Sequence, residues 1–281
     1  MRRCGSRGRS ANISTVSSGT DIVAAPRPRK PSDGLFWITG ASSGIGRELA
    51  LESVRRGWRV VATARRAEEL EALAKASPVP GAIIPAPCDV TDETAMRALV
   101  TRIEAEHGVV ARAFLNAGVF YPVEIEPFDT WKYHKSLAVN LGGVVNALGA
   151  IVPGMLARGG GQIAVNASVA GYTGMPTSAA YGATKAGLIN MVESLKFDGD
   201  RRGILFQLVN PGFVETPATA QNSFEMPHLV KVDDAARRIA DGLDDGRFEI
   251  FFPKRFAWQL KILALLPYRL YFWILKRSTG A

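Results

Sequence analysis

The stretch L-F-W-I-T-G-A-S-S-G-I-G, residues 35–46, decides the fold of this chain. Its first four residues form an apolar run, typical of a strand buried on both faces of a parallel sheet. Gly40, Gly44 and Gly46 then predict a turn with little side-chain bulk, and a helical apolar pattern follows over 45–54. This order places backbone N–H groups and a helix N-terminus where a pyrophosphate can bind. The stretch favours a dinucleotide site, with a purely structural turn as the alternative.

The composition is that of one α/β domain from a reducing compartment. The chain has 281 residues, of which 47% are hydrophobic, enough for a single large core. Its two cysteines, Cys4 and Cys88, are too few for a disulfide framework. The three histidines are isolated from one another, so we expect no metal site. These features favour a cytoplasmic protein.

The net charge of +8 arises at the two ends of the chain. Residues 1–34 carry a net charge of +5 and residues 251–281 carry +6, which leaves −3 for the residues between them. A basic folded body would indicate a nucleic-acid-binding domain, so we expect no nucleic acid partner. Residues 1–34 are rich in Arg, Ser and Gly and lack apolar periodicity, which predicts a disordered basic extension.

Strand and helix patterns alternate after the glycine turn. This alternation predicts a Rossmann-type, doubly wound parallel sheet in a single α/β domain over residues 35–253. Ligands bind such sheets at the carboxyl ends of the strands. Further strands are expected over 58–63, 82–86, 113–115, 161–167 and 204–209, and further helices over 67–76, 92–106, 128–156 and 179–198.

Basic, acidic and amide side chains follow the second to fourth expected strands. Arg65 and Arg66 stand where an NAD site would carry an acidic residue for the ribose 2′-hydroxyl. Guanidinium groups bind a 2′-phosphate, so this position favours NADP(H) over NAD(H). Asp89 and the turn Asn116-Ala117-Gly118 come where an adenine ring would lie. A solvated helix start and ordinary turn residues are the alternatives.

The strongest chemical signal is the combination of Ser168, Tyr181 and Lys185. Tyr181 and Lys185 are four residues apart on an expected helix and share one face. A tyrosine is an acid or base at neutral pH only if its pKa, about 10, falls by about three units. A nearby ammonium group in a partly dry cleft supplies an energy of that order. Ser168 ends the fifth expected strand, so its hydroxyl can reach the same point.

Seven motifs, in this order, resemble the short-chain dehydrogenase/reductase family. They are T-G-A-S-S-G-I-G (39–46), C-D-V (88–90), N-A-G (116–118), V-N-L-G (139–142), Ser168, Y-G-A-T-K (181–185) and P-G-F-V-E-T (211–216). The resemblance covers residues 35 to about 250. One departure is Leu115, where the family often has a further asparagine.

This resemblance implies a carbonyl/alcohol oxidoreductase that uses a nicotinamide cofactor. Tyr181 would exchange a proton with the substrate oxygen, Ser168 would hold that oxygen, and Lys185 would bind the nicotinamide ribose and lower the pKa of Tyr181. Asn140 would anchor a water that returns the proton through Lys185. The family also implies a homo-oligomer, and NADP(H) implies reduction. The expected cofactor-binding residues are Gly40, Ser42, Ser43, Gly44, Ile45, Gly46, Arg65, Arg66, Asp89, Val90, Asn116, Ala117, Gly118, Tyr181, Lys185, Pro211, Gly212, Val214 and Thr216.

The expected substrate is a small hydrophobic carbonyl compound. The segments 172–178, after Ser168, and 217–231, after the sixth strand, carry apolar side chains in or beside them, although the same residues could pack a lid. Their apolar side chains are Tyr172, Met175, Phe213, Phe224, Met226 and Leu229.

Residues 254–281 are expected to form a hydrophobic and basic C-terminal helix. The segment 256–275 is near the length that spans a bilayer, but Lys261, Pro267 and Arg269 argue against a span. Its aromatic residues and flanking cations favour an interfacial helix at a membrane surface. A helix over the substrate cleft or at a subunit interface is the alternative.

Three other functions compete with a reductase. A cofactor-sensing protein on the same fold would typically lack the tyrosine and lysine that this chain retains. A membrane-surface adaptor has only the segment 256–275 in its favour. An epimerase or dehydratase would use the same pair but needs a larger substrate subdomain than the chain provides.

Overall fold

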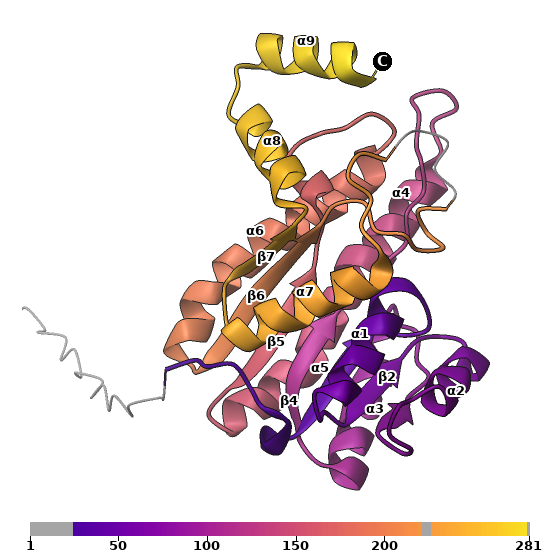
Figure 1. Cartoon of the computed structure of the whole chain (residues 1–281), viewed down its shortest axis with the longest axis vertical. Helices are drawn as coiled ribbons and strands as arrows, with labels where there is room; N and C mark the ends of the chain where they lie inside the picture. The colour runs from indigo at the N-terminus through magenta and orange to yellow at the C-terminus, as the bar shows by residue number, and fades with distance from the viewer. Residues whose placement is uncertain (1–24, 221–225, 280–281) are drawn as a thin grey trace, which may run out of the picture.

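Seven parallel strands form one sheet in the order β3-β2-β1-β4-β5-β6-β7 (Figure 1). The structure is a computed structural model that describes residues 25–220 and 226–279, so the expectations for 1–24 and for Phe224 lie outside it. The strands are β1 (Leu35–Thr39), β2 (Val60–Thr63), β3 (Ile83–Pro85), β4 (Val110–Leu115), β5 (Gly161–Asn166), β6 (Ile204–Pro211) and β7 (Glu249–Phe252).

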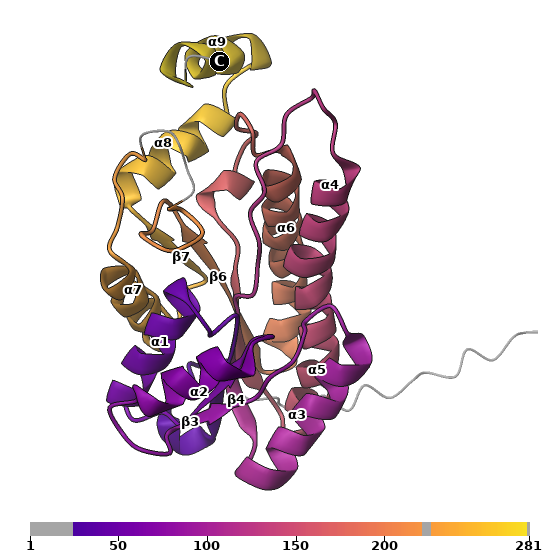
Figure 2. The ribbon, with the colours of Figure 1, turned by 90° about the vertical axis from the view of Figure 1, so that its right-hand side faces the viewer.

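Helices cover both faces of the sheet, which makes three layers (Figure 2). One face carries α1 (Gly44–Arg55), α2 (Ala67–Lys75) and α7 (Val232–Asp245). The other carries α3 (Glu93–His107), α4 (Thr130–Ser136), α5 (Gly143–Ala157) and α6 (Ala179–Arg201). Each face buries its own apolar cluster against the central strands, and all five residues of β1 are buried. The predicted Rossmann-type, doubly wound sheet is confirmed.

The strand order reverses between β1 and β4. From β1 the chain goes to β2 on one side, and it returns to β4 on the other side. Loops at the carboxyl ends of these two strands therefore part, and a crevice forms between them. This crevice is where the glycine turn after β1 meets the residues after β4.

One long helical run, Thr130–Ala157, joins α4 to α5 through a turn of π-helix, Leu137–Gly142. By length and composition this run could cross a membrane. Its residues Val144, Ala147, Ile151 and Met155 are buried in the core beside the sheet, so in this fold it is a core helix. The π turn was not predicted, and it carries Asn140, consistent with the frequent occurrence of such turns at functional sites.

Part of the N-terminal extension expected to be disordered is packed on the domain. Residues 25–34 lie against the amino ends of the strands, where Arg112 donates a hydrogen bond to the carbonyl of Arg29. Arg112 is 2% exposed, pairs with Asp244 at 2.9 Å and donates to Gln162 at 2.8 Å. Its guanidinium also lies 4.5 Å from the ring centre of Trp58. A buried cation thus binds the extension to β4 and β5.

The C-terminal segment forms two helices, α8 (Lys254–Ala264) and α9 (Tyr268–Thr279), where one helix was expected. The break comes at Pro267, which has no N–H to continue the helix and disfavours helical geometry at the residue before it. Figure 1 shows α9 lying across the far end of α8. The buried side chains Leu260 and Leu263 of α8 pack in one cluster with Tyr271 and Leu275 of α9.

We predict that Arg112→Ala destabilises the fold by about 3 kcal/mol, because it leaves several polar partners and two aromatic rings without the buried cation. Chemical denaturation measures this loss. The control Arg201→Ala removes an exposed arginine and should cost less than about 0.5 kcal/mol. Equal losses in the two variants would refute a structural role for the buried cation.

Candidate active site

A single cavity of about 1380 Å³ runs from the glycine turn, along the carboxyl ends of the strands, to α8 and α9. It gathers nearly every residue that the sequence singled out. Of the predicted catalytic and cofactor-binding residues, Gly46 and Asn140 are not part of its lining. The others, from Gly40 to Thr216, come from the start of α1, from α6, from the last residue of β6 and from the loops after β1, β2, β3, β4, β5 and β6.

The glycine turn leaves no room for a side chain at Gly40 or Gly46. A Cβ at Gly46 would lie 2.3 Å from the carbonyl oxygen of Gly40, and a Cβ at Gly40 would lie 2.8 Å from the Cα of Ala117. Gly40 also has a positive φ of 66°. Ser43, the residue before α1, makes no side-chain cap, so the first N–H groups of the helix face the cavity uncapped. This arrangement fits the phosphates of a dinucleotide.

Two asparagines brace the turn against the sheet. The Asn116 amide donates to the carbonyls of Thr39 and Gly40 at 3.1 and 3.2 Å, and it accepts a hydrogen bond from Asn166 at 2.8 Å. The Oδ1 atom of Asn166 is buried and has no partner among the described residues. Sequence reasoning missed Asn166, although it is a polar residue in an apolar strand two positions before Ser168.

Arg65 and Arg66 have different surroundings at the rim of the cavity. Arg66 is exposed and forms an ion pair with Glu69 at 2.6 Å. Arg65 forms no ion pair or hydrogen bond with the residues that the structure describes, and its charge acts on Asp89. Burial raises the pKa of Asp89, but hydrogen bonds from Thr91 and this charge outweigh it, so the pKa is below the usual range. A guanidinium is therefore available beside an ionised carboxylate.

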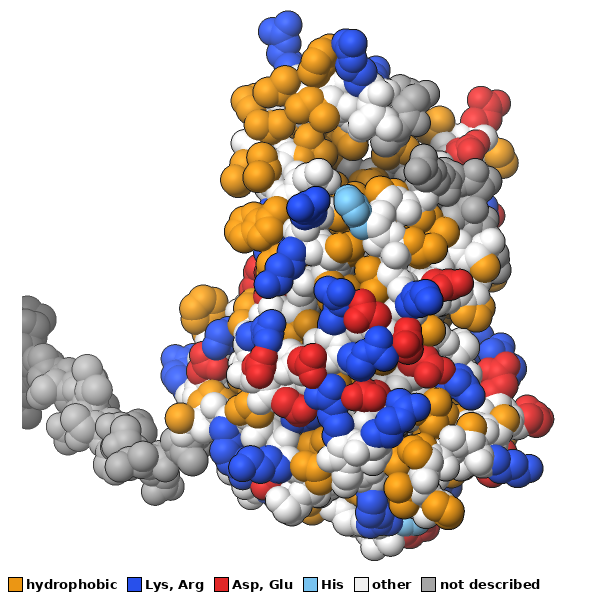
Figure 3. Space-filling view, in the orientation of Figure 1, with side chains coloured by type: hydrophobic (Ala, Val, Ile, Leu, Met, Phe, Trp, Pro, Cys, Tyr) orange, Lys and Arg blue, Asp and Glu red, His pale blue; other side chains and the backbone are white. Residues whose placement is uncertain are grey.

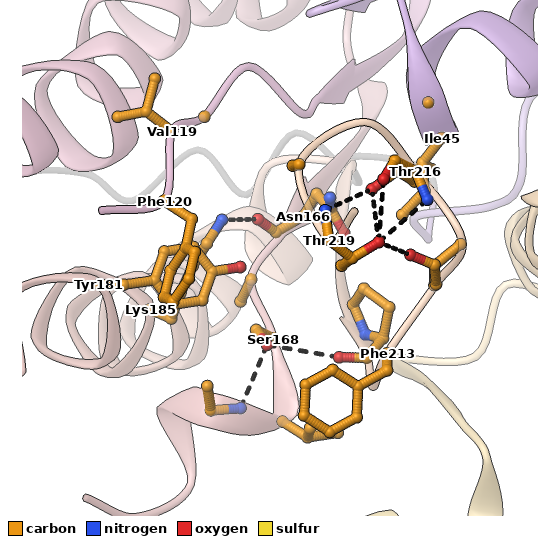
Figure 4. A pocket seen from close by; sticks show the side chains of 18 of the residues that line it. Ile45, Val119, Phe120, Asn166, Ser168, Tyr181, Lys185, Phe213, Thr216 and Thr219 are labelled. Atoms are coloured by element: carbon orange, nitrogen blue, oxygen red, sulfur yellow. Dashed lines mark hydrogen bonds between the residues drawn. The ribbon is translucent and has the colours of Figure 1, made fainter. Parts of the chain in front are cut away.

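Ser168, Tyr181 and Lys185 converge at the middle of the cavity (Figure 4). Tyr181 and Lys185 project from the same face of α6, and the Lys185 ammonium lies 5.4 Å from the Tyr181 ring centre. The Ser168 hydroxyl accepts from the backbone N–H of Ala170 at 3.1 Å and lies 3.4 Å from the carbonyl of Pro211. Phe120 packs edge-on against the Tyr181 ring.

Burial dominates the protonation of the two α6 side chains. Lys185 is 3% exposed, and burial lowers its pKa to about 7; its Nζ donates to the backbone carbonyl of Asn166 at 2.7 Å. Burial raises the pKa of Tyr181, while a side-chain hydrogen bond with Ser168 acts in the opposite direction. Without a ligand the pair is therefore held toward its neutral forms.

Asn140 lies behind the site and holds its back wall. Its side chain bonds both the N–H and the carbonyl of Val119, at 2.7 and 2.9 Å, and donates to the Thr184 hydroxyl at 3.1 Å. The π turn thereby connects the loop after β4 with α6 at the residue next to Lys185. Gly118 leaves room for this contact, because a Cβ there would lie 3.3 Å from Asn140 Oδ1.

Apolar side chains line the end of the cavity beyond Ser168. Of the residues proposed for the substrate, Met175 and Phe213 line it, whereas the Tyr172 hydroxyl donates to Glu249 at 2.6 Å. The C-terminal helices α8 and α9 cover this end, which is one of the roles that the sequence left open for this segment. Their lining residues are Phe256, Gln259, Leu260 and Leu263 of α8 and Ile274, Leu275 and Ser278 of α9.

A polar cluster fastens α8 to the edge of the sheet. Glu249 of β7 accepts hydrogen bonds from Lys261 of α8, from Tyr172 and, at 2.8 Å, from Asn210. Burial would raise the pKa of Glu249, but these three donors outweigh it and lower the pKa. The cover over the apolar end of the cavity is therefore anchored by charge as well as by packing.

The groups that meet in the cavity offer acid–base and polar chemistry. Within residues 25–220 and 226–279, no three His, Cys, Asp or Glu side chains gather as a metal would require. The site provides the hydroxyls of Ser168 and Tyr181, the buried amine of Lys185 and the uncapped N–H groups at the start of α1.

We predict that replacing Lys185 by Met changes how stability depends on pH. The folded pKa of about 7 is below the unfolded value of 10.5, so the unfolded chain takes up the proton first as the pH falls between them. The wild type thus loses stability over this window, on the order of a few kcal/mol, and Lys185→Met does not. Urea denaturation of the cofactor-free protein at pH 7 and about pH 10 measures the difference. A variant-minus-wild-type difference that is the same at both pH values would contradict a buried, neutralised lysine.

Comparison with known proteins places these features in one family. Residues 35–226 match the short chain dehydrogenase family. An uncharacterized oxidoreductase of Myxococcus xanthus is 35% identical over 82% of this chain and 91% of its own length. The 3-oxoacyl-[acyl-carrier-protein] reductase of Thermotoga maritima is 33% identical over 65% of this chain and 74% of its own. A solved short-chain dehydrogenase from Streptomyces avermitilis superposes with a TM-score of 0.75 at 26% identity, covering 88% of this chain and 98% of the other.

Proposed function

The chain belongs to the short-chain dehydrogenase/reductase family of NAD(P)-dependent oxidoreductases that act on CH–OH groups, and we propose that it reduces the carbonyl group of a hydrophobic, lipid-like substrate with NADPH. The observation that carries the proposal is the convergence of Ser168, Tyr181 and Lys185 between the glycine turn and the apolar end of the cavity. The chain is then a catalyst rather than a cofactor sensor, an adaptor or an epimerase.

The residues around the glycine turn fit a nicotinamide dinucleotide. Uncapped N–H groups at the start of α1 would hold its phosphates, and the unpartnered Oδ1 atom of Asn166 would face its nicotinamide half. Val214 and Thr216, in the loop after β6, would lie against the carboxamide. When bound, the cofactor supplies the hydride for the carbonyl carbon.

Each of the three central side chains has one task in the proposed reduction. Ser168 donates a hydrogen bond to the substrate oxygen and fixes its position. Tyr181 donates the proton that this oxygen takes up. Lys185, in its charged form, stabilises the phenolate that remains and then gives it a proton, and water held near Asn140 reprotonates Lys185. The apolar surroundings exclude other water and strengthen these interactions.

The preference for NADPH rests on Arg65. Its charge has no ion-pair partner among the described residues, whereas Arg66 is paired with Glu69. The residues after β2, Ala64-Arg65-Arg66, include no carboxylate for a ribose 2′-hydroxyl. The 2′-phosphate of NADPH would therefore meet the Arg65 guanidinium at this position. The 2′-hydroxyl of NADH would meet no carboxylate there.

The choice of a hydrophobic substrate rests on the lining beyond Ser168. Met175, Phe213, Leu260, Leu263 and Ile274 enclose this end of the cavity. A sugar or a polar acid has more hydroxyl or carboxylate groups than the few polar side chains there, such as Gln259 and Ser278, can bind, and each buried group left without a partner costs about 1–3 kcal/mol. The carbonyl oxygen of an apolar compound would meet the Ser168 and Tyr181 hydroxyls, and its hydrocarbon part would be buried against the apolar lining.

The remaining parts of the proposal concern where the enzyme works. We propose a cytoplasmic homo-oligomer with three parts: an N-terminal extension over 1–34, a catalytic domain over 35–253, and a C-terminal region over 254–281. The C-terminal region brings the enzyme to a membrane surface. Residues 25–34 of this extension pack on the domain, where the carbonyl of Arg29 accepts a hydrogen bond from Arg112.

We predict that Tyr181→Phe lowers kcat by about 10²–10⁴-fold while leaving NADPH affinity within about twofold, because it removes only the proton donor. Steady-state turnover of hydrophobic aldehydes and ketones, with cofactor titration by protein fluorescence, separates the two effects. Wild-type turnover in this variant would overturn the assignment of the acid.

We predict that Arg65→Ala weakens NADPH binding by about 10- to 100-fold and leaves NADH binding nearly unchanged, since a charge-assisted hydrogen bond contributes about 1.5–3 kcal/mol. Arg66→Ala is the matched control, and its effect should be smaller because its guanidinium is already paired with Glu69. Fluorescence titration of both cofactors tests this order. Equal loss of NADH and NADPH affinity in Arg65→Ala would contradict recognition of the 2′-phosphate.

A further inference from the structure

The helices α8 and α9 expose large apolar side chains on the side that faces away from the cavity. This surface, here called the outer face, is 44–84% exposed at its apolar residues. In Figure 3 apolar side chains gather at the end of the molecule formed by these helices, with cations among them. The apolar residues are Trp258, Ile262 and Leu265 of α8 and Tyr268, Leu270, Phe272 and Trp273 of α9.

The fold itself does not need the outer face. The opposite sides of both helices already provide the packing, through Leu260, Leu263 and Leu275 at the end of the cavity. The Tyr271 hydroxyl donates to the carbonyl of Gly174, and Lys261 pairs with Glu249. The two helices are thus fixed in place by their inner sides, and seven large apolar side chains remain toward solvent. A contiguous exposed patch of this kind marks an interaction site.

The outer face is basic as well as apolar. From residue 250 to the end of the sequence there are six Lys and Arg and no Asp or Glu. Five of these cations are exposed, and Arg277 lies 5.4 Å from the ring centre of Trp273. The exposed cations are Lys254, Arg255, Arg269, Lys276 and Arg277.

We propose that the outer face of α8 and α9 docks on an anionic lipid bilayer, so that the apolar end of the cavity lies at the lipid surface. Trp and Tyr side chains are enriched at the level of the lipid headgroups, and each Lys or Arg near an anionic surface adds to binding. The substrate route rests on the proposed reductase function, but the docking itself does not.

Charge decides between a bilayer and a second copy of this chain. In a two-fold dimer the same surface meets itself, so the cations of one outer face would meet those of the other. Because no acidic residue follows Glu249, neither face could supply counter-charges to the other. An anionic bilayer supplies them along its whole surface and also accepts the aromatic side chains.

Docking would explain why the two helices that cover the cavity also carry the outer face. The inner sides of α8 and α9 line the apolar end of the cavity, and their outer sides would contact lipid. A carbonyl compound dissolved in the bilayer could then enter past these helices without crossing water. Its transfer into the cavity would exchange one apolar environment for another, at little cost in free energy.

Co-sedimentation of the full chain with vesicles tests the proposal. We expect binding to vesicles of phosphatidylcholine with phosphatidylglycerol and at least tenfold weaker binding to phosphatidylcholine alone. Trp273→Glu should reduce anionic binding at least tenfold, and the double variant Lys276→Gln/Arg277→Gln about 30-fold. The matched controls are Val79→Glu, an exposed apolar residue after α2, and Arg201→Gln/Arg202→Gln at the opposite end of the sheet. Both controls should bind like the wild type.

Two results would overturn docking. One is a wild type that binds neither kind of vesicle while still turning over substrate, which removes the proposed membrane location and leaves the proposed reductase activity intact. The other is a Trp273→Glu variant that binds vesicles normally but changes from dimer to monomer by light scattering, which would assign the outer face to a second copy. Cofactor titration of every variant verifies that it is folded. A wild type that binds no cofactor would refute the proposed function, independently of the docking result.

Discussion

The close approach of the glycine turn to β4 is the constraint on which the site depends. A Cβ at Gly46 would meet the Gly40 carbonyl at 2.3 Å, and the Asn116 amide closes the same space from the other strand. Only because the backbones come this near can the start of α1 lie over the point where the strand order reverses. The same asparagine bonds Asn166, and the Asn166 carbonyl accepts from Lys185. One chain of contacts thus connects the glycine turn to the amine at the centre of the site.

Burial of Tyr181 and Lys185 lowers the stability of their charged forms, but it also prepares both groups for proton transfer. It holds the pKa of Lys185 near 7 and raises that of Tyr181, so an ammonium there costs free energy in the empty protein. The fold tolerates this cost because the surrounding α6, β5 and π turn are fixed by packing and by Asn140. A ligand that brings polar groups into the cavity changes this balance. Groups that are costly in the free protein are the ones a reaction can use.

The sequence predicted those features of the fold and the site that depend on a few neighbouring residues. The apolar run of β1, the glycine spacing, and the pairing of Tyr181 with Lys185 are each contained in a few neighbouring residues, and the parallel sheet follows from their alternation. The roles of Arg112 and Asn166 depend on partners far away in the sequence, so no local pattern contains them. Helix α7 and strand β7 were missed, although Asp233, Asp234 and the left-handed Gly246 are ordinary helix-end signals. The proline that separates α8 from α9 was noticed only as an argument against a membrane span. The structure shows its other consequence, two short helices that cover the cavity.

The central claim is that Tyr181 is the acid of a nicotinamide-dependent reaction, and its own titration tests this most directly. The ultraviolet difference spectrum between wild type and Tyr181→Phe reports the phenolate of this residue among the six tyrosines of the chain. The account predicts that the pKa of Tyr181 is raised above its usual value in the free protein and falls once NADP⁺ is bound, because a charged Lys185 and the cationic ring then favour the phenolate. A Tyr181 titration that is the same with and without saturating cofactor would contradict the account.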